Sequence, residues 1–211
     1  MISSEEALAR LVEGNRRFAA GTAGGASQRN FEMRDQLAAG QHPWAIVLGC
    51  SDSRVPIEMV FDQGPGDLFV VRVAGNVVAP TQMGSIELAV ERFGTRLVVV
   101  LGHSRCGAIA AALDEIERPG AMMPPGLRSI IDLVRPSVEG FLAATSRPDR
   151  ETLIARGMRA NVLASVNRLV SGSDVLARLV RSQQLAVVGA EYSLETSLVH
   201  FFDGTQAESV V

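Results

Sequence analysis

Three continuous apolar runs in the first half of the chain limit its fold more than any other feature. They cover residues 45–49, 68–73 and 97–101 and consist almost entirely of apolar side chains. Strands of this kind are buried on both faces, which is typical of parallel sheets covered by helices. Helical spacing at residues 84–93 and 108–116 places helices between and after the runs. The pattern predicts an α/β fold with a mostly parallel central sheet.

The second half of the chain continues this alternation. Residues 185–189 form one more buried apolar run, and residues 199–202 indicate a short edge strand. A segment rich in proline and glycine at 117–126 indicates a loop. Helical patterns follow at 127–142, where Pro136 is a candidate break, at 150–170 and at 174–182.

The N-terminal segment predicts an amphipathic helix over residues 3–20. Ser3 and Glu6 have the spacing of a capping box, and an apolar stripe follows at Leu8, Leu11, Val12 and Phe18. A glycine-rich link at 21–27 then separates this helix from the rest. We therefore divide the chain into a helical arm and link, 1–26, and a single α/β domain, 27–211. The sequence leaves open whether the arm packs on its own domain or on a neighbouring subunit.

Composition excludes several classes of protein. The chain has 211 residues and a formal net charge of −3, whereas a nucleic-acid binder carries a basic surface. No apolar run approaches the roughly 20 residues of a membrane helix. The N-terminus has Glu5 and Glu6 in place of the basic stretch of a signal peptide. We expect a cytoplasmic protein that binds neither nucleic acid nor membrane.

The two cysteines lie in short polar motifs at the ends of apolar runs. Cys50 begins Cys-Ser-Asp-Ser-Arg after the run at 45–49, and Cys106 ends His-Ser-Arg-Cys after the run at 97–101. Loops at the carboxyl ends of neighbouring parallel strands converge. Two thiolates and the imidazole of His103 suit tetrahedral zinc. A disulfide is the alternative, but the absence of a secretion signal favours reduced thiols and a metal site.

The fourth zinc position has no further cysteine or histidine in a ligand motif. His42 precedes Pro43 in a predicted surface loop, and His200 lies outside any motif. The position is left for water or for Asp52, a candidate fourth ligand, and an open position is typical of catalytic zinc. We expect residues 51–54 to be extended, so that the side chains of Asp52 and Arg54 leave the chain on the same side. The Arg54 guanidinium can then hold the carboxylate through two hydrogen bonds.

Together these motifs resemble a β-class carbonic anhydrase. The resemblance runs from about Glu13 to Leu113, with a looser match at 187–192, and rests on CSDSR (50–54), GPGDLFVVR (64–72), AGN (74–76) and VLGHSRCGA (100–108). It implies zinc held by Cys50, His103 and Cys106, with Asp52 and Arg54 as a catalytic dyad. It also implies an added antiparallel strand beside about four parallel ones, and a homodimer or dimer of dimers in which the N-terminal helix crosses to the partner.

The resemblance further implies a substrate pocket. Gln41 lies nine residues before Cys50, where many members carry a glutamine that hydrogen-bonds substrate, and Phe69 and Leu88 are expected to line an apolar wall. Leu88 replaces a tyrosine of plant-like members, and Val73 replaces a common asparagine. Val47 stands where members with an inhibitory bicarbonate pocket carry tryptophan, although Arg72 and Tyr192 match other parts of that pocket.

The reaction that the resemblance implies is attack of zinc-bound hydroxide on carbon dioxide, giving bicarbonate and a proton. Two alternatives stay open at the level of sequence. One is hydrolysis of carbon disulfide or carbonyl sulfide at the same zinc site, and the other is a zinc-stabilised scaffold or anion-binding module. The Asp52–Arg54 pair and the lack of a fourth soft ligand favour an enzyme.

Overall fold

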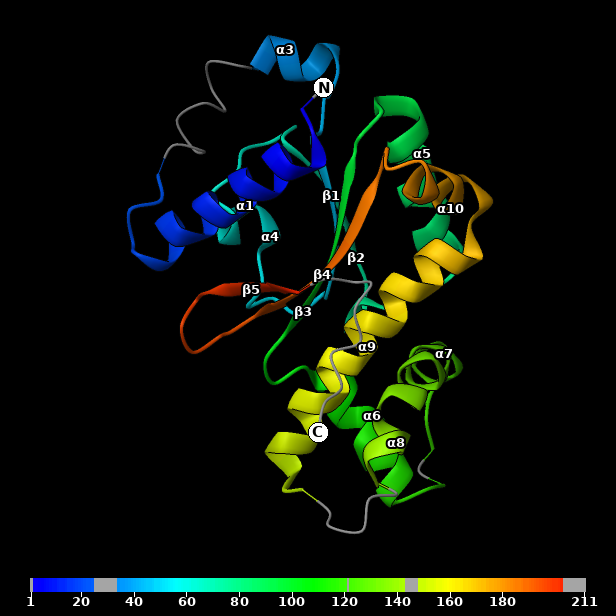
Figure 1. Cartoon of the computed structure of the whole chain (residues 1–211). Helices are drawn as coiled ribbons and strands as arrows, with labels where there is room; N and C mark the ends of the chain where they lie inside the picture. Colours follow the sequence, from blue (N-terminus) through cyan, green and yellow to red (C-terminus); the bar gives the residue numbers. More distant parts are fainter. Residues whose placement is uncertain (1, 25–33, 121, 143–147, 203–211) are drawn as a thin grey trace.

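A five-stranded sheet forms the centre of the molecule (Figure 1). The structure is a computed structural model that describes residues 2–24, 34–120, 122–142 and 148–202. The strand order is β2-β1-β3-β4-β5, with β1 to β4 parallel and β5 antiparallel to β4. The strands are β1 (Ala45–Gly49), β2 (Leu68–Arg72), β3 (Leu97–His103), β4 (Ala186–Tyr192) and β5 (Val199–Phe202). The predicted α/β sheet and its antiparallel edge strand are confirmed.

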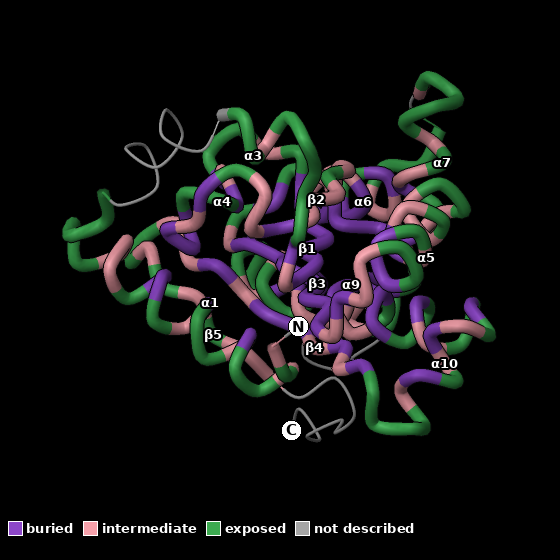
Figure 2. Tube along the Cα trace, turned by 90° about the horizontal axis from the view of Figure 1, so that it is seen from above, coloured by how far each residue is buried: buried purple, intermediate pink, exposed green. Residues whose placement is uncertain are grey.

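Helices cover both faces of the sheet (Figure 1). One face carries α1 (Ser4–Ala19) and α4 (Ile57–Val60). The other face carries α5 (Pro80–Phe93), α6 (Gly107–Glu117), α7 (Pro125–Val134), α8 (Pro136–Leu142), α9 (Arg150–Gly172) and α10 (Asp174–Arg181). Two further elements are α3 (Arg34–Ala39) and the short 3-10 helix η1 (Ala74–Asn76). Figure 2 shows the strands as a buried layer between these two groups of helices.

Each central strand contributes to two apolar cores because its side chains alternate between the faces. In β3, Val98 and Val100 belong to the core beneath α5 to α10. Leu97, Val99 and Leu101 belong to the core beneath α1 and α4. All five are at most 1% exposed. This two-sided burial explains why the sequence has continuous apolar runs where its strands lie.

Several elements extend beyond the predicted bounds. β3 continues through His103 and β4 through Tyr192, because the two strands pair up to the row His103↔Tyr192. α5 begins four residues early at Pro80, a position where the missing N–H of proline costs no hydrogen bond. The proposed break at Pro136 is confirmed, since α7 ends at Val134 and α8 begins at Pro136.

The N-terminal helix α1 packs on its own chain. Ser3 caps it, because its Oγ accepts a hydrogen bond from the Glu6 N–H at 3.1 Å, as the capping box predicts. The Leu11 side chain is fully buried against α4 and the sheet. The Nδ2 of Asn15 donates to the carbonyl oxygens of Val60 and Ser197. Of the two arrangements that the sequence left open, the structure shows the helix packed on its own domain. The proposed domain boundary between residues 26 and 27 lies outside the described residues.

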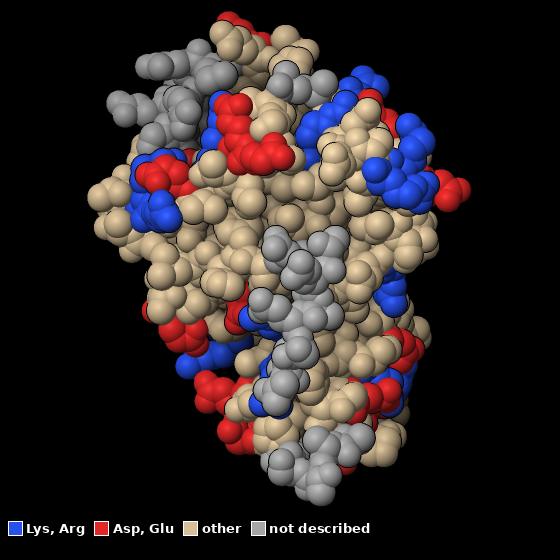
Figure 3. Space-filling view, viewed as in Figure 1, with Lys and Arg blue, Asp and Glu red and all other residues tan. Residues whose placement is uncertain are grey.

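The charged surface is mixed. On the face in Figure 3, acidic and basic side chains lie beside one another, separated by larger areas of uncharged residues. Among the helices of the described residues, none is both long and apolar enough to cross a membrane.

Candidate metal centre

The three predicted zinc ligands meet at the carboxyl ends of β1 and β3. Cys50 directly follows β1, His103 is the last residue of β3, and Cys106 is the N-cap residue of α6. All three are buried, and their ligand atoms lie within 4.8 Å of one another. Because the strands are parallel neighbours, their ends deliver the two loops to one point. The structure confirms the convergence predicted from the motifs.

His103 is oriented so that one ring nitrogen is free for a metal. Its Nδ1 lies 2.9 Å from the carbonyl oxygen of Ser104, to which it donates in the neutral tautomer. Its Nε2 is buried and has no hydrogen-bond partner. A buried polar atom without a partner is costly, and a bound cation removes that cost. Together with two free thiols, this donor set fits zinc.

The two thiols of the cluster shift each other's pKa in opposite directions. A hydrogen bond with Cys106 lowers the pKa of Cys50 to about 4, with smaller contributions from His103 and from the Gly75 N–H. The same hydrogen bond, together with burial, raises the pKa of Cys106. Cys50 is therefore the more acidic thiol of the pair. A dication beside both sulfurs favours two thiolates, so metal binding at this cluster releases a proton.

Asp52 and Arg54 form the predicted bidentate pair. The Nε and Nη2 of Arg54 donate to the two carboxylate oxygens of Asp52 at 2.9 and 2.8 Å. The backbone N–H of Arg54 also donates to Asp52 Oδ1 at 3.0 Å, so the segment is a turn and not the extended chain that we expected. These hydrogen bonds hold the pKa of Asp52 well below its usual range. Oδ2 of Asp52 lies 3.9 Å from His103 Nε2, which places an ionised carboxylate beside the cluster.

Backbone contacts that the sequence did not reveal fix the Cys50 loop. The Gly75 N–H, in η1, donates to Cys50 Sγ at 3.3 Å. Arg72 donates to the carbonyl oxygens of Cys50 and Asp52 at 3.0 and 2.7 Å. From α9, the Nδ2 of Asn161 donates to the Gly75 carbonyl at 2.7 Å. The sequence signal for this support is the presence of two polar residues, Asn161 and Ser165, on the otherwise apolar, buried face of α9.

The three predicted pocket residues do not reach the cluster of their own chain. Gln41 is exposed and precedes β1, whereas Cys50 follows that strand. Phe69 pairs with Ile46 near the start of β2. Leu88 is half exposed on α5. Their role in substrate binding stays a prediction.

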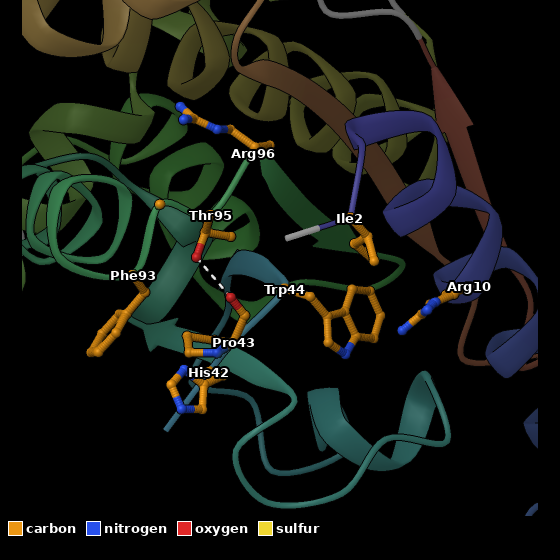
Figure 4. A pocket seen from close by; sticks show the side chains of 9 residues that line it. Ile2, Arg10, His42, Pro43, Trp44, Phe93, Thr95 and Arg96 are labelled. Carbon is orange, nitrogen blue, oxygen red and sulfur yellow. Dashed lines mark hydrogen bonds between the residues drawn. The ribbon is translucent and has the colours of Figure 1, made fainter. Parts of the chain in front are cut away.

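A separate pocket lies at the amino ends of the strands (Figure 4). Its lining includes His42, Trp44 and Phe93, and the Thr95 hydroxyl donates to the Pro43 carbonyl at 2.8 Å. The guanidinium carbon of Arg10 lies over the Trp44 ring, 5.8 Å from the ring centroid. His42 is exposed, as predicted. No residue of the zinc cluster lines this pocket.

Comparisons with known proteins agree with this geometry. The family described as Carbonic anhydrase matches residues 45–199. Carbonic anhydrase 2 of Mycobacterium tuberculosis H37Rv is 41% identical over 186 residues, which cover 88% of this chain and 86% of that protein. The carbonic anhydrase of Mycolicibacterium smegmatis is 42% identical over 188 residues, covering 87% and 86%.

Solved structures show the same relationship. The crystal structure of the β-carbonic anhydrase CafA of Aspergillus fumigatus superposes with a TM-score of 0.75 at 30% identity, covering 97% of this chain and 92% of that one. The β-carbonic anhydrase CcaA superposes with a TM-score of 0.74 at 25% identity, covering 96% and 94%. The chain therefore belongs to the carbonic anhydrase family, in its β-class.

Proposed function

We propose that this protein is a carbonic anhydrase that converts carbon dioxide and water reversibly to bicarbonate and a proton. The observation that carries the proposal is the buried Cys50–His103–Cys106 cluster, with its unpartnered imidazole nitrogen, beside a carboxylate paired with arginine. Zinc bound by these three residues supplies a nucleophile from water near neutral pH. Side chains of the protein itself position the water and the carboxylate.

The dyad has two separate tasks in this proposal. Asp52 stays ionised because Arg54 occupies both of its oxygens, so it accepts a hydrogen bond from the reacting water and directs that water toward carbon dioxide. Because Arg54 holds both carboxylate oxygens, Asp52 would not be free to ligate a metal bound by the cluster. Of the two candidates for the fourth position, water and Asp52, this pairing favours water.

The dyad is tested by Arg54→Ala in the zinc-loaded protein. We expect kcat for carbon dioxide hydration to fall by about 10²-fold or more, within the range of a positioned acid–base group, while zinc content stays unchanged. Arg150→Ala is the matched control, since Arg150 also forms an exposed ion pair, 2.7 Å from Asp114. Unchanged kcat in Arg54→Ala would refute the dyad. Turnover of carbon disulfide without turnover of carbon dioxide would refute the proposed substrate.

A second copy of the chain is also part of the proposal. Gln41 and Phe69 lie at the amino ends of their strands, and the cluster lies at the carboxyl ends. If they bind substrate, as the family resemblance implies, they serve the cluster of another subunit. We propose a homodimer or dimer of dimers on this ground, in which α1 stays packed on its own chain and does not cross to the partner. We further propose a cytoplasmic location, where both thiols stay reduced.

A further inference from the structure

The loop between His103 and Cys106 is held by a carboxylate from another part of the chain. Glu195 lies in the turn between β4 and β5. Its Oε2 accepts a hydrogen bond from the Ser104 hydroxyl at 2.8 Å. Its Oε1 lies 2.8 Å from Nε of Arg105. The two residues that separate the metal ligands are thus both bound to one side chain.

The turn that carries Glu195 is itself fixed on both sides. The Leu194 N–H donates to the Ser104 hydroxyl at 3.0 Å, and the Ser193 hydroxyl donates to Glu195 at 3.2 Å. From α1, Asn15 donates to the Ser197 carbonyl at 3.0 Å and accepts from the Val199 N–H at 2.8 Å. The carboxylate therefore belongs to a cross-linked turn and does not swing freely in solvent.

The two residues that Glu195 holds orient the site through their carbonyl groups. The Ser104 carbonyl accepts from His103 Nδ1, which leaves Nε2 for the metal. The Arg105 carbonyl accepts from Nη2 of Arg54 at 3.3 Å. Arg105 also has φ of +55°, a left-handed conformation that is strained in a residue other than glycine. Such a backbone needs outside contacts to hold it, and Glu195 supplies one.

We propose that Glu195 is a positioning residue of the metal centre. Through Ser104 it fixes the tautomer and orientation of His103, and through Arg105 it fixes the carbonyl that holds Arg54. The inference rests on the proposed zinc site and adds a residue that neither the ligand motif nor the dyad contains. Outer residues of this kind typically change metal affinity by about 10- to 100-fold when removed.

The test compares Glu195→Ala and Glu195→Gln with Glu139→Ala and Glu139→Gln. Glu139 is a matched control on α8, since its side chain is 48% exposed against 45% for Glu195 and it pairs with Arg135 at 3.1 Å. Zinc release to a chelator is timed, and the thiolate absorption bands of the cobalt(II)-substituted proteins are recorded. Thermal unfolding of each variant is measured in parallel.

We expect Glu195→Ala to release zinc about tenfold faster and to shift the cobalt bands, with a melting temperature close to that of Glu139→Ala. Glu195→Gln should release zinc at a rate between those of the wild type and Glu195→Ala. Its amide oxygen still accepts a hydrogen bond from Ser104, but the side chain has no charge to attract Arg105. When Ser104→Ala and Glu195→Ala are combined, their effects on the rate of zinc release should be less than additive.

Release kinetics and cobalt bands like the wild type in both Glu195 variants would overturn the positioning role while leaving the zinc site standing. Wild-type protein that binds neither zinc nor cobalt would overturn the proposed function together with this inference. The two failures are therefore distinguishable in one experiment.

Discussion

At the scale of single residues, the cluster depends on one glycine as well as on its ligands. Gly75 donates its N–H to Cys50 Sγ and has φ of +69°. A Cβ at this position would lie 3.0 Å from the Cβ of Ala108 and 3.2 Å from Cγ2 of Val134. Backbone conformation and space therefore both require glycine here.

Gly75→Ala should destabilise the protein by about 1–3 kcal/mol, through the left-handed φ and the close contacts. It should also speed zinc loss, because the donor to Cys50 moves. Gly84→Ala is the control, since Gly84 lies within α5 with open space around its Cβ position and should gain roughly 0.5–1 kcal/mol. Urea unfolding measures both variants, and equal stability of Gly75→Ala and the wild type would contradict the account.

At the scale of elements, α9 supports the metal centre from behind η1. Asn161 and Ser165 lie one helical turn apart, and they donate to the carbonyl oxygens of Gly75 and Asn76. Asn161→Ala leaves a buried carbonyl without its donor, at a cost of about 1–3 kcal/mol. Asn167→Ala, at an exposed position of the same helix, should stay within about 0.5 kcal/mol of the wild type. Equal unfolding midpoints for the two variants would rule this support out.

Strand β4 carries a carboxylate whose ionisation opposes folding. Burial raises the pKa of Glu191, although Arg159 and His200 act in the other direction. The folded chain therefore binds this proton more tightly than the unfolded chain. The stability that protonated Glu191 contributes is fully present below the pKa of the unfolded chain, about 4.3. It is lost as pH rises through the higher pKa of the folded chain.

Glu191→Gln should thus be more stable than the wild type at neutral pH, by up to about 0.5 kcal/mol. The advantage should disappear below about pH 4, where both chains carry a neutral side chain. Thermal unfolding from acid to neutral pH measures the difference. A constant difference across this range would show that ionisation of Glu191 is not its cause.

The sequence predicted the elements whose signal is local. Continuous apolar runs located the four parallel strands, residues 199–202 were predicted as the edge strand, and ligand-type residues directly after two of the runs located the cluster. The ends of β3 and β4 were missed because Gly102, His103 and Glu191 interrupt the apolar runs, and pairing between strands extends both. The contact of Asn161 with Gly75 spans 86 positions and has no local pattern. Glu195 was missed for the same reason, since it meets the metal loop only after β4 and β5 are placed.

At the scale of the whole molecule, the cluster lies at the carboxyl ends of the strands, whereas Gln41 and Phe69 of the predicted pocket lie at the amino ends. A complete substrate site on this account needs a second chain. Sedimentation of the full-length protein should give a dimer or a multiple of it at micromolar concentration. Deleting residues 1–20 uncovers the apolar face beneath Ala7 and Leu11 and should cause aggregation. A stable full-length monomer would contradict the assembly and leave the metal site unaffected.

The most direct test of the account measures zinc content and carbon dioxide hydration together, in the wild type and in Cys106→Ser. After dialysis against a mild chelator, the wild type should retain about one zinc per chain and hydrate carbon dioxide in stopped flow between about pH 7 and 9. Cys106→Ser should lose most of its zinc and its activity together. Full zinc in Cys106→Ser, or a zinc-loaded wild type that hydrates no carbon dioxide, would contradict the account.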